Sequence, residues 1–197
     1  MLGVAAMALA SCTQNEVVEY AENRAIQFDT FVNNNTRAGI TEIGKTGDLT
    51  GYYVYGYHTD NVPVFENVKV TNAGVDKSAY WQQGKTYNFA AYSDGNAKLT
   101  SGVSFEAKTN TLTISGYTPD NSKDLVAAVA DELTCNDPQT QRKVELSFKH
   151  MLSQVKFTFK NEDSRSYKMK ISDIKISNAV KTGTGTLEGN SVATWSG

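Results

Sequence analysis

Apolar and polar side chains alternate with a period of two along most of this chain after residue 50. The alternation is clearest in residues 51–57, 87–91, 103–107, 111–115 and 144–148. Successive side chains of a β-strand point to opposite faces of the sheet, so the pattern predicts strands that each bury one face. Turn signals such as Asp94-Gly95-Asn96 separate the runs. The sequence therefore predicts an all-β fold, an antiparallel β-sandwich.

Two parts of the chain are less regular. Residues 124–133 (DLVAAVADEL) have apolar residues at helical spacing, and taken alone they fit a helix and a buried strand equally well. Further strands are expected at residues 155–159, 167–171 and 174–176. Because the apolar parity changes between residues 148 and 155, a bulge or tight bend is expected near residues 151–153.

Length and charge limit the class of protein. The chain has 197 residues, of which 40% are hydrophobic, which suffices for one domain or for one domain and part of a second. Lys and Arg number 19 against 21 Asp and Glu, a formal net charge of −2. That balance gives no attraction to nucleic acid, so a nucleic-acid partner is not expected.

The N-terminus reads as an export signal that ends in a lipidation site. Residues 1–12 (MLGVAAMALASC) form a short apolar run, and Leu9-Ala10-Ser11-Cys12 fits the lipobox of bacterial lipoproteins. We expect residues 1–11 to be a signal peptide, Cys12 to be lipidated and residues 12–24 to be a polar tether. No Lys or Arg precedes the apolar run, so a basic leader region is expected upstream of Met1.

No set of residues in the sequence predicts an enzyme. Residues 39–46 and 79–86 match the phosphate-loop pattern in its strict and relaxed forms, but neither is set between a strand and a helix, so we interpret both as turns. His58 and His150 lack the spacing of metal ligands, and Cys135 is expected to be a buried thiol. His150 is expected to point inward at the bend. We expect no catalytic residue, metal or cofactor.

An aromatic row is the strongest candidate for a ligand surface. Alternation places Tyr53, Tyr55 and Tyr57 on one side of a strand, where they could contact a glycan or a protein. The alternative is that the rings simply pack as an ordinary aromatic row of the sheet. The first interpretation predicts a surface lipoprotein that acts as a binding module.

Several segments in order resemble one family. Residues 25–39, 80–95, 124–128 and above all 144–159 (VELSFKHMLSQVKFTF) are similar to the fimbrillin family of Bacteroidales, the lipoprotein subunits of type V pili. The resemblance implies two transthyretin-like β-sandwich domains, no catalytic activity, and a strand rather than a helix from Asp124. It implies a structural subunit or anchor of a surface pilus, located in the fimbrium or lipid-anchored to the cell outer membrane, which contributes to adhesion.

The same resemblance implies how such a subunit assembles. In family members an arginine-specific protease cuts near the N-terminus, the first strand leaves, and a strand of another pilus subunit takes its place. Arg37, followed by Ala38, is the matching position, with Arg24 a second candidate; anchor members stay uncut. We expect an N-terminal domain at residues 25–141 and the beginning of a C-terminal β domain at residues 142–197, which are too few for a complete second sandwich. The alternative is that the last strands complete the first sheet.

Overall fold

The computed structural model describes residues 24–32, 48–100, 102–130, 132–153, 155, 157–162 and 170–197. Their strands are β1 (Phe28–Val32), β2 (Gly51–His58), β3 (Val62–Thr71), β4 (Gly74–Val75), β5 (Thr86–Asp94), β6 (Val103–Glu106), β7 (Thr111–Tyr117), β8 (Leu125–Val129), β9 (Leu133–Thr134), β10 (Val144–His150), β11 (Gly183–Glu188) and β12 (Thr194–Ser196). A short 3-10 turn, η2 (Thr59–Asn61), follows β2. These residues contain no α-helix, so the prediction of an all-β fold is confirmed.

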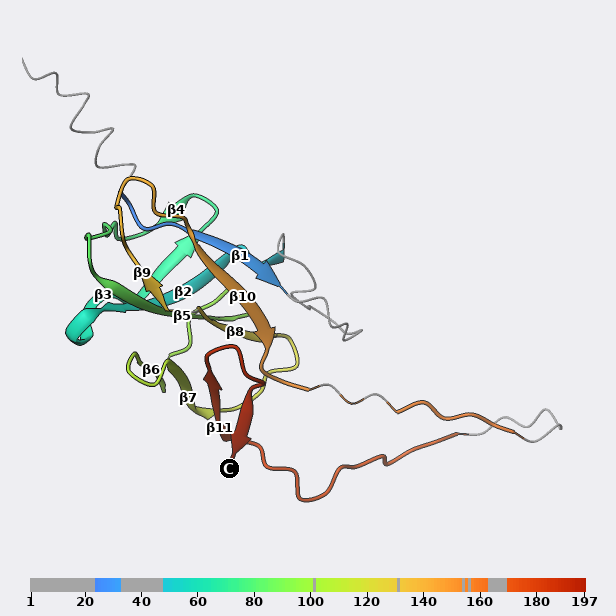
Figure 1. Ribbon diagram of the computed structural model, residues 1–197. Coiled ribbons are helices and arrows are strands. Elements are labelled where there is room, and N and C mark those ends of the chain that lie inside the picture. The colour runs from blue at the N-terminus through green and yellow to red at the C-terminus, as the bar shows by residue number, and fades with distance from the viewer. Residues whose placement is uncertain are drawn as a thin grey trace, which may run out of the picture.

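The strands form two sheets. The larger one is curled into a half-barrel and has eight strands in the order β1-β10-β8-β5-β2-β3-β4, with β9 paired to β5 beside that path (Figure 1). The smaller one has the order β12-β11-β7-β6 and is antiparallel. The expectation of purely antiparallel sheets is wrong in one place, because β1 runs parallel to β10. Parallel neighbours need a long connection, and here most of the chain separates the two strands.

Two apolar cores lie on the two faces of the larger sheet. The first fills the inside of the curl, and its largest fully buried side chains are Trp81, Tyr87, Phe65, Phe89 and Phe148. The second lies between the larger and the smaller sheet and includes Tyr92, Leu125, Leu112, Ile114 and Leu187. The strands in the middle of the larger sheet therefore have no face turned to water.

Strand β8 shows why the sequence from residue 124 was ambiguous. All five of its residues are buried. Val126 and Ala128 belong to the first core, while Leu125, Ala127 and Val129 belong to the second. A strand covered on both faces loses its alternation and reads as a continuous apolar run. The strand that the family resemblance implied is confirmed.

Strand β10 follows its predicted pattern closely. Val144, Leu146 and Phe148 are fully buried, whereas Glu145 and Ser147 are exposed. The chain then bends at Leu152, within the predicted residues 151–153.

An extended arm replaces the strands expected after that bend. The arm consists of the described residues between β10 and β11, namely 152–153, 155, 157–162 and 170–182, which lie outside the two sheets (Figure 1). The described parts of the expected strands 155–159, 167–171 and 174–176 are not paired with another strand. Alternation makes a strand only where a neighbour supplies backbone hydrogen bonds and a surface to cover the apolar row, and the described part of the fold offers neither here.

Candidate functional site

Strand β1 lies at the edge of the larger sheet, with β10 as its strand neighbour (Figure 1). The parallel register pairs Phe28 with Val144 and Val32 with Phe148. Just before β1, the Gln27 carbonyl accepts a hydrogen bond of 2.8 Å from the backbone N–H of Val144. An edge strand that pairs on one side can leave without breaking the rest of a sheet.

The inner side of β1 is part of the first core. The Phe28 ring packs edge-on against Phe65 and Phe89, with centroids 5.7 Å apart in both pairs. Ile26 and Val32 are also buried, with 2% and 8% of their surface exposed. Asp29 and Phe31 point outward, and the Asp29 carboxylate pairs with the Lys143 ammonium at 3.2 Å. The strand thus fills an apolar groove and shows a polar outer face broken by Phe31.

Arg24 precedes this strand and is held by the loop around Trp81. Its carbonyl accepts a hydrogen bond from the Trp81 amide at 2.9 Å, and Ile26 donates to the Ala79 carbonyl at 2.8 Å. The Arg24 guanidinium donates to the Trp81 carbonyl at 3.5 Å. Proteases need an extended, unpaired stretch of chain. The peptide bond after Arg24 lacks one, because both of its sides are paired to residues 79–81.

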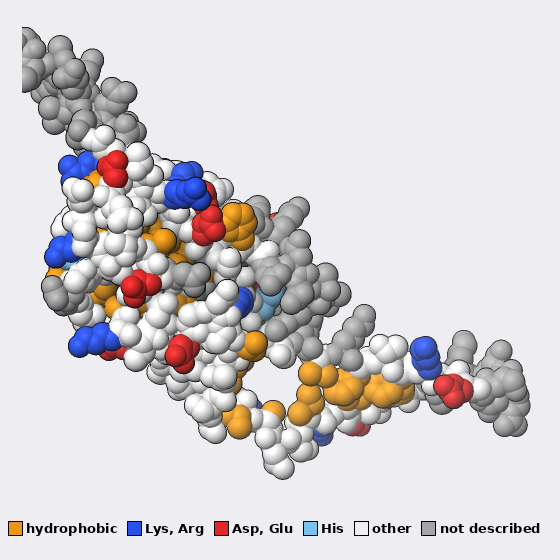
Figure 2. Space-filling model, viewed as in Figure 1, with side chains coloured by type: hydrophobic (Ala, Val, Ile, Leu, Met, Phe, Trp, Pro, Cys, Tyr) orange, Lys and Arg blue, Asp and Glu red, His pale blue; other side chains and the backbone are white. Residues whose placement is uncertain are grey.

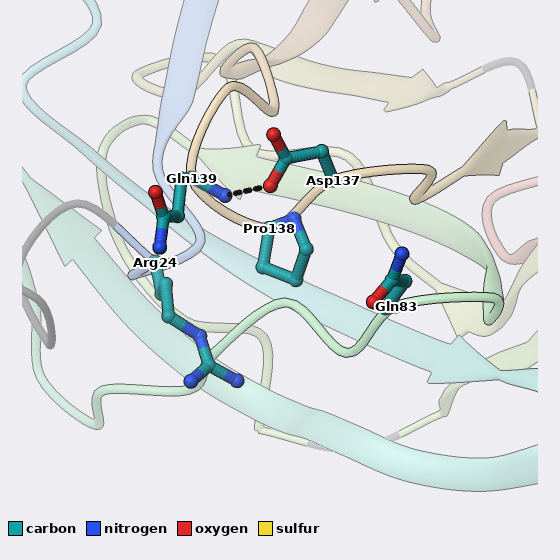
Figure 3. A pocket seen from close by; sticks show the side chains of 5 residues that line it. All are labelled: Arg24, Gln83, Asp137, Pro138 and Gln139. Atoms are coloured by element: carbon teal, nitrogen blue, oxygen red, sulfur yellow. Dashed lines mark hydrogen bonds between the residues drawn. The ribbon is translucent and has the colours of Figure 1, made fainter.

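The Arg24 side chain also borders a pocket of about 240 Å³ (Figure 3). Gln83, Asp137, Pro138 and Gln139 complete its lining. The Arg24 guanidinium points away from the Asp137 carboxylate, which accepts a hydrogen bond of 2.9 Å from the backbone N–H of Gln139. The buried Nε atom of Arg24 has no hydrogen-bond partner among the described residues. The pocket shows no pair of groups positioned for catalysis.

The other residues that the sequence predicts to be lipidated or cleaved lie outside the described part of the chain. Cys12, Arg37 and Ala38 lie outside the residues that the structure describes, so these sites stay predictions. Arg37 belongs to the segment that follows β1 directly.

The structure brings the tyrosine row together on the side of β2 that faces the second core. Tyr55 has 8% of its surface exposed, and its hydroxyl donates to the Val103 carbonyl at 3.2 Å. Burial raises the pKa of Tyr55 above its ordinary value. Tyr53 and Tyr57 are half-buried, with Tyr53 stacked on Tyr92 at 5.7 Å. Much of the row therefore serves packing, and Tyr57, at the end of the row, is the member that borders a cleft.

The residues that could bind a metal or act as an acid or base lie apart from one another in the fold. His150 points inward, as expected, and its Nδ1 atom lies 2.9 Å from a carboxylate oxygen of Asp124. His58 is at the end of β2, with Nδ1 3.2 Å from the Thr59 carbonyl. Cys135 is a buried free thiol, and burial raises its pKa. Within the described ranges no three His, Cys, Asp or Glu side chains gather as metal ligands.

The arm carries a group of apolar side chains that the described part of the fold leaves exposed. Seven are between 46% and 70% exposed, namely Val155, Phe157, Phe159, Ile171, Ile174, Ile176 and Val180. Figure 2 shows apolar side chains gathered along the arm beyond the two sheets. Exposed apolar clusters of this kind mark interaction surfaces. Among the described residues no helix has the length and apolar character needed to span a membrane.

Two comparisons with known proteins find nothing, and one finds a family. A sequence model described as fimbrillin-like matches residues 24–196. No curated protein and no solved structure matches the chain.

Proposed function

The chain belongs to the fimbrillin-like family, whose members are structural pilus proteins and not enzymes, and we propose that it assembles into a pilus by β-strand exchange. The observation that carries this proposal is the position of β1, an edge strand whose inner side chains fill the groove of the larger sheet. While β1 is in place it covers that groove and keeps the subunit from joining others.

Release of β1 requires a cut after it and not before it. The peptide bond after Arg24 is paired on both sides with residues 79–81, whereas Arg37 follows the strand within a polar stretch, Asn33-Asn34-Asn35-Thr36. We therefore assign the cut to the bond between Arg37 and Ala38, made by an arginine-specific protease. After the cut, β1 is held by noncovalent contacts alone.

The vacated edge of β10 would then accept a strand from another subunit. Its backbone groups would be unpaired, and Phe65, Phe89 and Phe148 would line an uncovered groove. A strand that restores the hydrogen bonds and fills the groove stabilises such an edge by β-augmentation. Cleavage, and not synthesis, would then set the time of assembly.

Substitution of Arg37 tests this assignment. Arg37→Ala is expected to leave the chain uncut and to remove filaments from the cell surface, while Arg24→Ala leaves them in place. N-terminal sequencing of subunits from sheared filaments is expected to read Ala38-Gly39-Ile40. Subunits that still begin at Cys12 would identify the chain as an uncut anchor, and filaments unchanged by Arg37→Ala would refute the mechanism.

The expected division after residue 141 stays a prediction. Strand β10 pairs with β1 and β8, and β11 pairs with β7, so the strands before and after the arm share both sheets with residues 25–141. The described part of the arm between them pairs with no strand. We propose that residues 142–197 begin a C-terminal β region whose strands β10 to β12 lie in these two sheets, and that the apolar side chains of the arm belong to it. The transthyretin-like form of the two domains is likewise part of the proposal.

Lipidation at Cys12 would place the precursor on the cell outer membrane. The proposal rests on the lipobox Leu9-Ala10-Ser11-Cys12 and on the polar tether of residues 12–24. Several acyl chains give stable attachment, whereas a single one binds weakly.

Replacing Cys12 tests the anchor. Cys12→Ala, expressed with a functional export leader, is expected to abolish incorporation of labelled palmitate and to move the protein from the membrane to the soluble fraction. Cys135→Ala is the matched control and should leave incorporation unchanged, because Cys135 is buried. Equal labelling of the Cys12→Ala variant would contradict the lipoprotein assignment.

A further inference from the structure

A cleft of about 400 Å³ opens where the two sheets part, at the end of β2 and the beginning of β5. Tyr57 and His58 border it from β2, and Asn88 borders it from β5. The turn after β6 contributes Lys108, and Glu132 lies between β8 and β9. Ligand pockets in proteins begin at about 300 Å³, so this volume is sufficient for a small ligand.

The polar side chain of Asn88 occupies a position where the fold calls for an apolar one. Asn88 pairs with Tyr57 across the two strands and shares its face with Ala90 and Tyr92, both of which are fully buried in the second core. Its side-chain amide makes no hydrogen bond with any of the described residues. Asn88 keeps part of its surface exposed in the cleft. A polar residue at a core-facing position is typical of a functional site.

Two rings beside Asn88 are held in fixed positions. The Tyr57 ring lies 6.0 Å from Phe105, and the His58 ring meets Tyr87 edge-on at 5.6 Å. Both side chains keep part of their surface exposed. Rings fixed by their own packing offer a flat apolar surface with little loss of side-chain freedom on binding.

The charges around the cleft are of both signs, with Lys108 and Glu132 in its lining and the carboxylates of Glu66 and Glu106 acting on Tyr57. Lys108 and Glu132 are exposed, and neither forms an ion pair within the described part of the chain. One ammonium among three carboxylates leaves the surroundings of Tyr57 net negative, which disfavours a phosphate or another anionic ligand. The lining instead suits a ligand that carries both hydrogen-bond donors and acceptors around an apolar face.

We propose that this cleft binds the terminal unit of a neutral saccharide, with the sugar's C–H face against Tyr57 and its hydroxyls bonded to Asn88 and Glu132. Sugar hydroxyls donate to the carboxylate and both donate to and accept from the amide. The cleft lies on the face of the larger sheet that holds the second core, opposite the groove that β1 fills, so it would serve the subunit whatever its mode of assembly. Such a site would supply an adhesive contact from the body of the subunit.

Amide NMR spectra of the isotope-labelled protein, titrated with methyl glycosides of galactose, mannose and N-acetylglucosamine, test the proposal. At least one glycoside is expected to shift the amides of residues 57–61, Asn88 and Lys108, with a Kd of about 1–10 mM for so shallow a site. Asn88→Ala and Glu132→Gln should each weaken binding about threefold to tenfold.

Matched controls separate binding from folding. Asn121→Ala and Glu145→Gln change the same residue types at exposed positions outside the cleft, and they should leave the affinity unchanged. Glu132 is exposed, so its substitution also leaves the fold intact. The proposal would be overturned if none of the three glycosides caused shifts, or if the shifts were confined to other residues. It would also be overturned if an unrelated peptide alone caused them. None of these outcomes bears on cleavage at Arg37.

Discussion

Replacement of Phe148 by Ala is expected to lower the free energy of unfolding by about 3–5 kcal/mol. Phe148 is fully buried in the first core, and its ring meets Tyr52 edge-on with centroids 5.4 Å apart. It is also the register partner of Val32, so the shortened side chain would leave a cavity beneath β1. Both the lost apolar burial and the cavity reduce stability.

Ser147→Ala is the matched control for that substitution. Ser147 is the preceding residue of the same strand and is exposed, so its replacement should change stability by less than about 0.5 kcal/mol. The neighbouring Lys149 is less suitable, because its ammonium donates to the carbonyls of Asn190 and Ser191. Urea titration of both variants gives the comparison, and similar small losses would show that the face of β10 is wrongly assigned.

Removal of β1 is expected to have the larger effect. A chain that begins at Ala38 lacks Ile26, Phe28 and Val32, whose side chains lie in or against the first core. At about 1.5–3 kcal/mol for each large apolar side chain, the free energy of unfolding should fall by roughly 5–9 kcal/mol. A chain that begins at Arg24 keeps the strand and is the control. Equal urea midpoints for the two chains would mean that β1 contributes nothing to the groove.

The sequence predicted those strands in which one face meets a core and the other meets water. Residues 144–148 are such a case, because their alternation survives unchanged in β10. It could not decide residues 125–129, which are buried on both faces and therefore lack alternation. The parallel pairing of β1 with β10 was beyond prediction, since alternation specifies the face of a strand but neither its neighbour nor its direction.

The candidate sites were predicted less well than the fold. Alternation correctly placed Tyr53, Tyr55 and Tyr57 on one side, but it carries no information on whether that side meets water or a second sheet. The signal of the cleft was Asn88, a polar residue in phase with Ala90 and Tyr92. Residues 155–159 alternate as a strand does, yet alternation does not supply the neighbour that a strand needs.

Addition of the missing strand to a subunit that lacks it tests strand exchange most directly. A labelled peptide of residues 24–32 is titrated into the chain that begins at Ala38, and binding is followed by fluorescence anisotropy. The account predicts saturable binding that restores the urea midpoint, and a peptide with Phe28→Asp should fail, because a carboxylate would face Phe65 and Phe89 in the groove. Equal binding of the two peptides, or binding of neither, would contradict it.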